Sequence, residues 1–310
     1  MRAPACTAAA FVLAVASATP AHTAAQEGGR PVFDAHVHLS EFTGGGRWIE
    51  SQAAADSIKA VFTRAGVRGG VGIASTFDIT RWDLPDGMIR AIGFPCPGGH
   101  VPNGGPPCFG DAREFPDLAE LRSHLASGAV QALGEIYTQY YGISPDDSRM
   151  DPYYALAEEF DVPVMIHMWH WNQPGGPPCC PDYRISGGDP LDLEKVLTRF
   201  PRLRIVVMHA AAPFGRELTI LMLRYPNVYA DVSGLLLMMG MPPLRELAEG
   251  YLAELAPMHS RLLFGSDNAY MIERALASLD QVAAFTEDQK NDILFDNAAR
   301  FFRITDGRSR

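Results

Sequence analysis

The stretch Val32-Phe33-Asp34-Ala35-His36-Val37-His38-Leu39 decides how the rest of the chain is interpreted. Its apolar residues predict a strand, and side chains two residues apart on a strand point to the same side. His36 and His38 therefore share one face, while Val37 and Leu39 take the other. Two imidazoles directed at one point make half of a metal site. Taken alone, the stretch also fits a pair of hydrogen-bonded histidines at a strand end.

Seven further strand-like runs follow this stretch, and helical segments alternate with them, the first expected from about Trp48 to Ala65. The runs are residues 67–74, 88–94, 129–136, 162–168, 203–209, 227–233 and 261–267. Near-continuous apolar residues, as in 205–208, indicate parallel strands covered on both faces. Eight such units in a chain of 310 residues predict an α/β fold, a single (β/α)8 TIM barrel. A doubly wound open sheet is the alternative.

The first residues have the pattern of a secretory signal peptide. Arg2 supplies a positive charge, residues 8–16 form a short apolar run, and small residues follow up to Ala25. A membrane anchor needs about 20 apolar residues, more than this run provides. We therefore expect residues 1–25 to be cleaved and residues 26–310 to form an exported barrel, periplasmic or secreted, with no membrane span.

The expected mature chain keeps an even number of cysteines, which suits an oxidising compartment. They are Cys96, Cys108, Cys179 and Cys180. Cys96 and Cys108 bracket a loop rich in Gly and Pro, and closing a loop of that size stabilises a fold by about 3 kcal/mol. Cys179 and Cys180 could bridge each other or reach the other loop. A thiolate metal site is a further alternative, although the spacing lacks a zinc-finger pattern.

The composition favours a small-molecule partner. The chain is 47% hydrophobic and 20% charged, which is enough for a large core, and its formal charge is −10. A chain this acidic offers no basic surface for polyanions, so we expect no nucleic-acid binding. The composition is compatible with a homo-oligomer.

Polar residues stand at the C-terminal ends of five of the expected strands. They are His36 and His38 on the first strand, Glu135 on the fourth, His167 on the fifth, His209 on the sixth and Asp267 on the eighth. Barrel enzymes build their active sites at this end. Each residue alone has an ordinary explanation as a core histidine or a turn residue. Together they would place several costly polar groups side by side, so a compensating partner is needed. Imidazole and carboxylate suit zinc and its neighbours.

The motifs around these residues resemble those of the amidohydrolase superfamily, in the amidohydrolase-related branch (amidohydrolase 2) that includes TatD-like hydrolases and metal-dependent decarboxylases. The similarity covers the expected mature chain almost end to end. The matching motifs are Asp34-Ala35-His36-Val37-His38, Gly134-Glu135-Ile136, Met165-Ile166-His167, Val207-Met208-His209, Tyr225-Pro226-Asn227-Val228-Tyr229, Leu263-Phe264-Gly265-Ser266-Asp267 and Asn297-Ala298-Ala299-Arg300-Phe301.

The resemblance implies one or two divalent metal ions, with zinc first and manganese, iron, cobalt or nickel as alternatives. His36, His38 and Asp267 would bind one ion, and Glu135 would bridge to a second ion on His167 and His209. A charge count agrees with two ions. Glu135, Asp267 and a bound hydroxide contribute about −3, so two divalent cations leave about +1, which favours a developing oxyanion. With a single ion, Glu135 would lie outside the ligand set.

We expect a metal-dependent hydrolase that attacks an amide, lactone or ester bond with a metal-bound hydroxide. Asp267 would be the general base and then the acid, and Asp34 would orient a ligand histidine. The alternative is a single-metal, non-oxidative decarboxylase of an aromatic or unsaturated acid. A non-enzymatic exported binding protein is a third hypothesis, which the complete ligand set disfavours.

Substrate contacts are expected from the loops that follow the strands. The candidates are Trp169, His170 and Trp171 after the fifth strand and Tyr137, Tyr140 and Tyr141 after the fourth. Ordinary loop packing is the alternative for each of them. Arg184 and His100 could meet a substrate anion, although single charged loop residues are usually solvated. The motifs do not specify the substrate.

Overall fold

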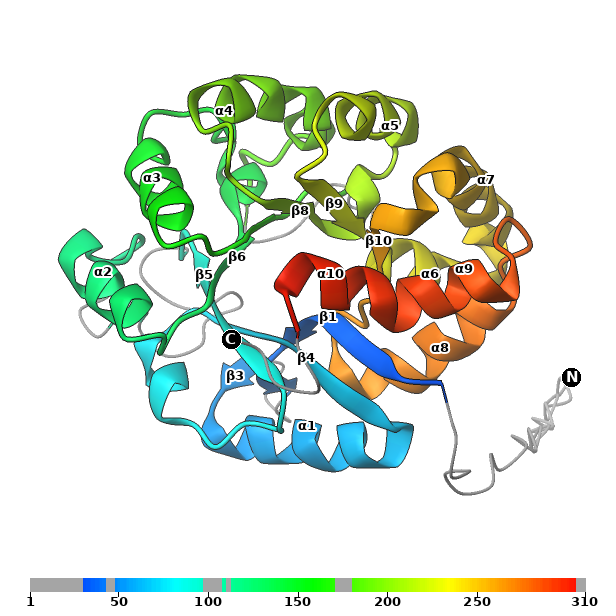
Figure 1. The fold of residues 1–310 in the computed structure, drawn as a ribbon, viewed down its shortest axis with the longest axis horizontal. Coiled ribbons are helices and arrows are strands. Elements are labelled where there is room, and N and C mark those ends of the chain that lie inside the picture. The colour runs from blue at the N-terminus through cyan, green and yellow to red at the C-terminus, as the bar shows by residue number, and fades with distance from the viewer. Residues whose placement is uncertain (1–29, 43–47, 97–107, 110–112, 171–179, 305–310) are drawn as a thin grey trace, which may run out of the picture.

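The computed structural model describes residues 30–42, 48–96, 108–109, 113–170 and 180–304. Eight parallel strands form one sheet in the order β1-β4-β5-β6-β7-β8-β9-β10 (Figure 1). Main-chain hydrogen bonds of 2.8 Å join its two edges, from Ala35 N to Phe264 O and from Asp267 N to His36 O. The fold is therefore the predicted (β/α)8 barrel. Its strands are β1 (Val32–His38), β4 (Val67–Ala74), β5 (Met88–Phe94), β6 (Ala132–Ile136), β7 (Val164–Ile166), β8 (Ile205–Val207), β9 (Val228–Asp231) and β10 (Leu262–Leu263).

Helices surround the barrel, as Figure 1 shows. The first is well delimited, because Ser51 Oγ accepts from Ala54 N at its start and Gly66 adopts a left-handed φ of 70° at its end. The helices are α1 (Gln52–Ala65), α2 (Leu118–Ala126), α3 (Asp151–Glu159), α4 (Leu193–Arg199), α5 (Gly215–Arg224), α6 (Ser233–Met239), α7 (Arg245–Leu255), α8 (Ile272–Asp280), α9 (Glu287–Asn291) and α10 (Asn297–Phe302).

The barrel has two apolar cores. The larger lies between the strands and the helices around them and includes Val37 and Leu39. The smaller fills the interior of the barrel and includes Phe33 and Ala35. α10 contributes to this inner core, since the Phe302 ring lies 5.4 Å from that of Phe33 at the start of β1. The N-terminal end of the barrel is thus filled with apolar side chains, which leaves the other end for polar groups.

Two strands change register just before the candidate ligands. On β1, Asp34 pairs with Gly70 but Val37 pairs with Gly72, so three steps on one strand match two on the other. On β6, the pairs are Leu133 with Val164 and Ile136 with Ile166, which is the same three-to-two mismatch. Such a shift resets the alternation of side chains across the sheet. On β1, the shift allows two consecutive residues, Ala35 and His36, to face the barrel interior.

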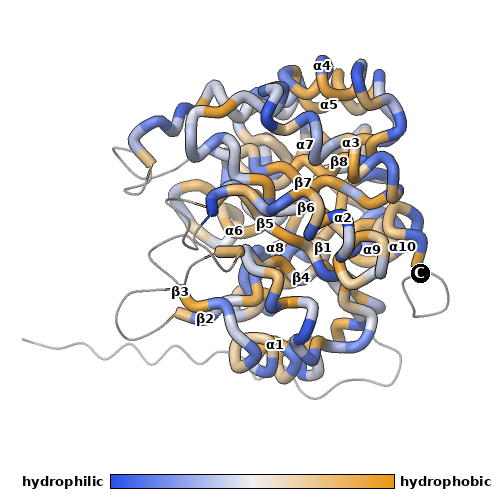
Figure 2. Tube along the Cα trace, turned by 90° about the vertical axis from the view of Figure 1, so that its left-hand side faces the viewer, coloured by the Kyte–Doolittle hydropathy of each residue, from blue (hydrophilic) through white to orange (hydrophobic). Residues whose placement is uncertain are grey.

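The structure corrects the expected helix that starts at Trp48. Residues Trp48–Glu50 form strand β3, which pairs antiparallel with β2 (Ser40–Phe42). The helix begins only at Gln52, because Ser51 is its N-cap. The hairpin projects from the opposite end of the molecule from α10 (Figure 2). It therefore stands at the same end of the barrel as the candidate ligands.

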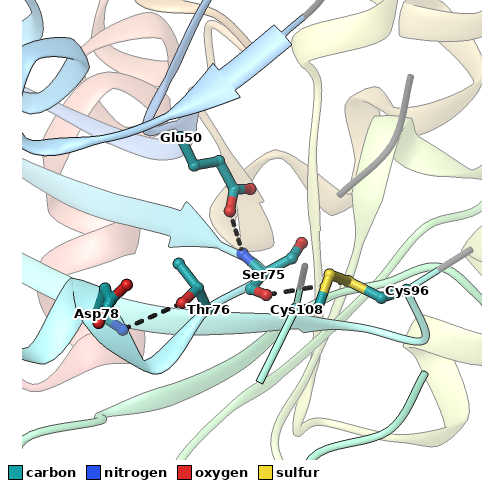
Figure 3. Close-up of a disulfide and its surroundings, with 6 residues drawn as sticks. All are labelled: Glu50, Ser75, Thr76, Asp78, Cys96 and Cys108. Atoms are coloured by element: carbon teal, nitrogen blue, oxygen red, sulfur yellow. Dashed lines mark hydrogen bonds between the residues drawn. A yellow bond between two sulfur atoms is a disulfide. The ribbon is translucent and has the colours of Figure 1, made fainter. Parts of the chain in front are cut away.

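The hairpin is fastened to the barrel close to a disulfide. Glu50 Oε2 accepts a hydrogen bond of 2.8 Å from Ser75 N, just after β4 (Figure 3). Cys96 and Cys108 form the disulfide, and Cys96 Sγ lies 3.9 Å from the carbonyl oxygen of Ser75. This confirms that expected pairing. Cys180 is also disulfide-bonded, and its partner is neither of these two cysteines.

Several expectations fall on residues outside the described ranges, namely the signal peptide at 1–25, Cys179, Trp171 and His100. Within the described ranges, no helix has the length and apolar character needed to cross a bilayer.

Several strands end earlier in the structure than the sequence predicted. The seventh was predicted to run to Ser233, but β9 ends at Asp231, and Ser233 begins α6. His167 and His209 likewise follow the last residues of their strands, and Asp267 lies beyond β10 in an isolated parallel bridge to Val37.

Candidate metal centre

Glu135 lies at the centre of the six predicted ligands. Its Oε2 is 3.2 Å from His38 Nε2 and 3.6 Å from His36 Nε2. Its Oε1 is 2.6 Å from His167 Nδ1 and 3.3 Å from His209 Nε2. Each carboxylate oxygen therefore faces a different pair of histidines. This division is the arrangement that a carboxylate shared by two metal ions would require.

The first histidine pair has the spacing of a metal site. His36 Nε2 and His38 Nε2 are 3.3 Å apart, and Asp267 Oδ1 lies 3.6 Å and 3.4 Å from them. Four atoms bound tetrahedrally to one ion at about 2.1 Å lie about 3.4 Å from one another. The separations among His36, His38 and Asp267, and those from Glu135 Oε2 to the two histidines, lie close to that value. The residues present thus fit a divalent ion of the zinc type.

The cluster is buried on every side but one. The side chains of His36, Glu135, His167 and His209 are 0 to 6% exposed. Those of His38 and Asp267 are 18% and 23% exposed. A ligand from solvent would therefore meet His38 and Asp267 first.

In the cluster, the buried carboxylates and histidines stabilise each other's charged forms. Burial alone raises the pKa of Glu135, but positive charge on His167 and His36 holds it well below its usual range. Burial likewise lowers the pKa of His36, whereas the carboxylates of Asp231 and Glu135 hold it well above its usual range. These carboxylates stay ionised only beside positive charge, which is also what a bound cation supplies.

Asp231 and Ser233 hold the other side of two ligand rings. Ser233 Oγ lies 3.0 Å from His209 Nδ1 and 3.3 Å from His36 Nδ1. Asp231 Oδ2 accepts from His209 N at 2.9 Å and lies 3.4 Å from His36 Nδ1. Partners at Nδ1 leave both Nε2 atoms free to face Glu135. These two residues were not predicted from the sequence, although they end the expected seventh strand as the six candidate ligands end theirs.

Two of the six residues have uncommon backbone conformations. His209 and Asp267 have φ values of 55° and 65°, in the left-handed region. A non-glycine residue there costs about 1–3 kcal/mol, and such residues gather at functional sites. The His209 N–H donates to Asp231, which helps to hold this conformation.

Asp34 supports the backbone of the site and makes no ring contact. It accepts from Ser266 N at 2.9 Å, from Ser266 Oγ at 2.6 Å and from His36 N at 3.1 Å. Burial raises its pKa to about 6. The expected orientation of a histidine ring falls to Asp231 and Ser233 instead, while Asp34 ties β1 to the segment before Asp267.

Aromatic residues from the predicted set surround the cluster. The Tyr137 ring stacks at 6.5 Å from His38, and the Tyr140 ring lies 4.6 Å from His167. The Trp169 ring lies 5.3 Å from His209, and the His170 ring lies 4.4 Å from Trp169. They form the walls of the site, although their contact with a substrate stays a prediction.

Gln139 holds the segment that follows His167. Its Oε1 accepts from Trp169 N at 2.9 Å, and its Nε2 donates to the carbonyl oxygens of Trp169 and Arg184 at 2.8 and 3.1 Å. The Arg184 guanidinium donates to the carbonyl oxygens of Pro181 and Tyr183. Arg184 thus takes part in loop structure, and its predicted contact with a substrate anion stays a prediction. No pattern in the sequence singled out Gln139.

Fold and cluster together define a barrel protein with a candidate metal centre at the C-terminal ends of its strands. A family model described as "Amidohydrolase" matches residues 33–304, so the chain belongs to this amidohydrolase family. A curated relative, protein fluG of Emericella nidulans, is 24% identical over 145 residues. That match covers 40% of this chain and only 16% of the relative.

Solved structures with the same fold include two named for different reactions. A probable 2-pyrone-4,6-dicarboxylic acid hydrolase from Acinetobacter baumannii has a TM-score of 0.55 and 13% identity, covering 88% of this chain and 99% of its own. A 5-carboxyvanillate decarboxylase from Sphingomonas paucimobilis has a TM-score of 0.53 and 12% identity, covering 89% of this chain and 100% of its own. These similarities show the fold and leave the reaction open. The TatD-like similarity stays a prediction.

Proposed function

We propose that this protein is a divalent-metal-dependent hydrolase that cleaves a carbonyl-type bond in an amide, lactone or ester. The observation that carries the proposal is the division of the Glu135 carboxylate between two histidine pairs. A carboxylate in that position suits two ions, and two-metal sites are suited to hydrolytic displacement. The nitrogen and oxygen donors favour zinc, with manganese, iron, cobalt and nickel as further candidates.

The bound ions would supply Lewis acidity and would lower the pKa of a water molecule at the site. His36, His38 and Asp267 form one group that would hold an ion, and His36, Glu135 and His209 form another. His167, whose Nδ1 faces Glu135 Oε1, would add a ligand on the His209 side of that carboxylate. Asp267 is the carboxylate of the cluster most open to solvent. It accepts the proton of the attacking water and then delivers that proton to the leaving group.

The proposal is tested by turnover and metal content together. The protein loaded with zinc or manganese is offered lactones, esters and amides, and aromatic carboxylic acids are offered in parallel with carbon dioxide as the readout. We expect hydrolysis that a chelator abolishes, with about two ions bound per chain. Carbon dioxide release without hydrolysis, at one ion per chain, would replace this proposal with the decarboxylase.

We also propose that residues 1–25 direct the protein out of the cytoplasm. The Cys96–Cys108 disulfide supports export, since disulfides persist in oxidising compartments. Expression of the full chain, followed by mass determination of the product, tests this. We expect the mass of a chain that begins near residue 26. A product that all retains residue 1 would contradict the proposal.

A further inference from the structure

Three aromatic side chains, two of them exposed, form a strip at the same end of the barrel as the cluster. The Trp48 ring lies 5.3 Å from Phe42 and stacks on Tyr270 at 6.0 Å with 17° between the ring planes. Phe42 and Tyr270 are 62% and 65% exposed. Exposed apolar residues standing singly are common, whereas here the half-buried Trp48 ring joins two exposed aromatic rings into one continuous apolar surface.

The strip sits on the two segments that lead away from the two accessible ligands. Phe42 and Trp48 pair across the β2–β3 hairpin, which follows His38 directly. Tyr270 lies in η9 (Ala269–Met271), which follows Asp267.

Solvent reaches the cluster from the side of His38 and Asp267, the residues whose following segments carry the strip. His38 and Asp267 are the members of the cluster that solvent reaches, and the other four side chains are at most 6% exposed. A substrate whose reacting carbonyl meets these two residues must place the rest of its structure outside the barrel end. Glu50 accepts a hydrogen bond from Ser75 N, next to β4 (Figure 3). This bond holds the hairpin, and with it Phe42 and Trp48, in place against the barrel.

We propose that Phe42, Trp48 and Tyr270 bind a flat apolar or aromatic group of the substrate, next to the carbonyl or carboxylate held at the cluster. The inference rests on the proposed metal centre, because it assigns the part of the substrate adjacent to the reacting group. Aromatic rings bury large areas and stack on one another with defined geometry. The substrate class is therefore an aryl or fused-ring carbonyl compound, in preference to a short aliphatic one.

Calorimetric titration of the zinc-loaded protein with 2-naphthoate and with acetate tests this assignment. Both probes carry a carboxylate for the cluster, and only naphthoate can use the strip. We expect naphthoate to bind at least about tenfold more tightly than acetate. Trp48→Ala and Tyr270→Ala, on separate segments, should each remove most of that preference. Leu223 on α5 is as exposed as Tyr270 but lies outside the strip, so Leu223→Ala should leave the naphthoate preference unchanged.

Equal affinity for the two probes, or a naphthoate preference that survives both substitutions, would overturn the assignment. So would a change in oligomer mass on Trp48→Ala with the preference intact, because the strip would then be a contact between copies of the chain. Failure of the hydrolase proposal is distinguishable: the lactone, ester and amide panel would show no turnover while the naphthoate preference persisted.

Discussion

His167 Nδ1 lies 2.6 Å from Oε1 of Glu135. The other oxygen of the same carboxylate faces His38 Nε2 at 3.2 Å. One side chain of β6 therefore joins candidate ligands from β1 to candidate ligands that follow β7 and β8. The proposed metal-dependent activity depends on that shared position.

Asp267→Asn should lower kcat by about 10²–10⁴-fold, because an amide cannot accept the proton of the attacking water. The thermal unfolding midpoint should stay close to that of the parent protein, since the substitution is nearly isosteric. Steady-state kinetics and thermal melting measure both quantities. Near-normal kcat would remove Asp267 as the general base.

Ser233→Ala and Asp231→Asn should each weaken metal binding by about 10–100-fold, because the Nδ1 atoms of His36 and His209 lose partners that set ring orientation. Competition with a chelator of known affinity measures the change. Asp56→Asn, on the exposed face of α1, serves as the matched control. Affinity equal to that of the control would mean that these residues do not position the ligands.

Gln139→Leu should reduce the free energy of unfolding by about 1–3 kcal/mol, since the Trp169 N–H loses its acceptor and the Trp169 C=O keeps only the Tyr183 hydroxyl of its two donors. Urea denaturation gives the value. Gln281→Leu, at an exposed position after α8, should have little effect. The prediction fails if the two variants are equally stable.

Replacing both Cys96 and Cys108 with serine should cost about 3 kcal/mol of stability, because the unfolded chain regains the entropy of a loop with a sequence separation of 12. Denaturation of both proteins without reductant makes the comparison. If the double variant is as stable as the parent, the bridge does not constrain the unfolded state.

The sequence predicted the barrel and the six-residue cluster because the relevant signals repeat along the chain. Each ligand is a polar residue at the end of an apolar run, and eight such runs alternate with helices. The disulfide between Cys96 and Cys108 was predictable for a similar reason, since the two residues bracket one short loop.

Other features depend on register and contact, which a linear pattern does not contain. The three-to-two mismatches on β1 and β6 set which side chains enter the barrel, and no residue type marks them. Trp48 and Glu50 resemble the start of the following helix, so the hairpin was missed. Gln139 acts through hydrogen bonds to residues 30 and 45 positions away, beyond any local motif.

Metal stoichiometry of the parent protein and of Glu135→Gln tests the central claim most directly. Mass spectrometry of the metal content after dialysis should give about two ions per chain for the parent and about one or fewer for the variant. Glu41→Gln, on the exposed strand β2, should match the parent. A Glu135→Gln protein that retains two ions per chain would contradict the shared carboxylate and the two-ion hydrolase built on it.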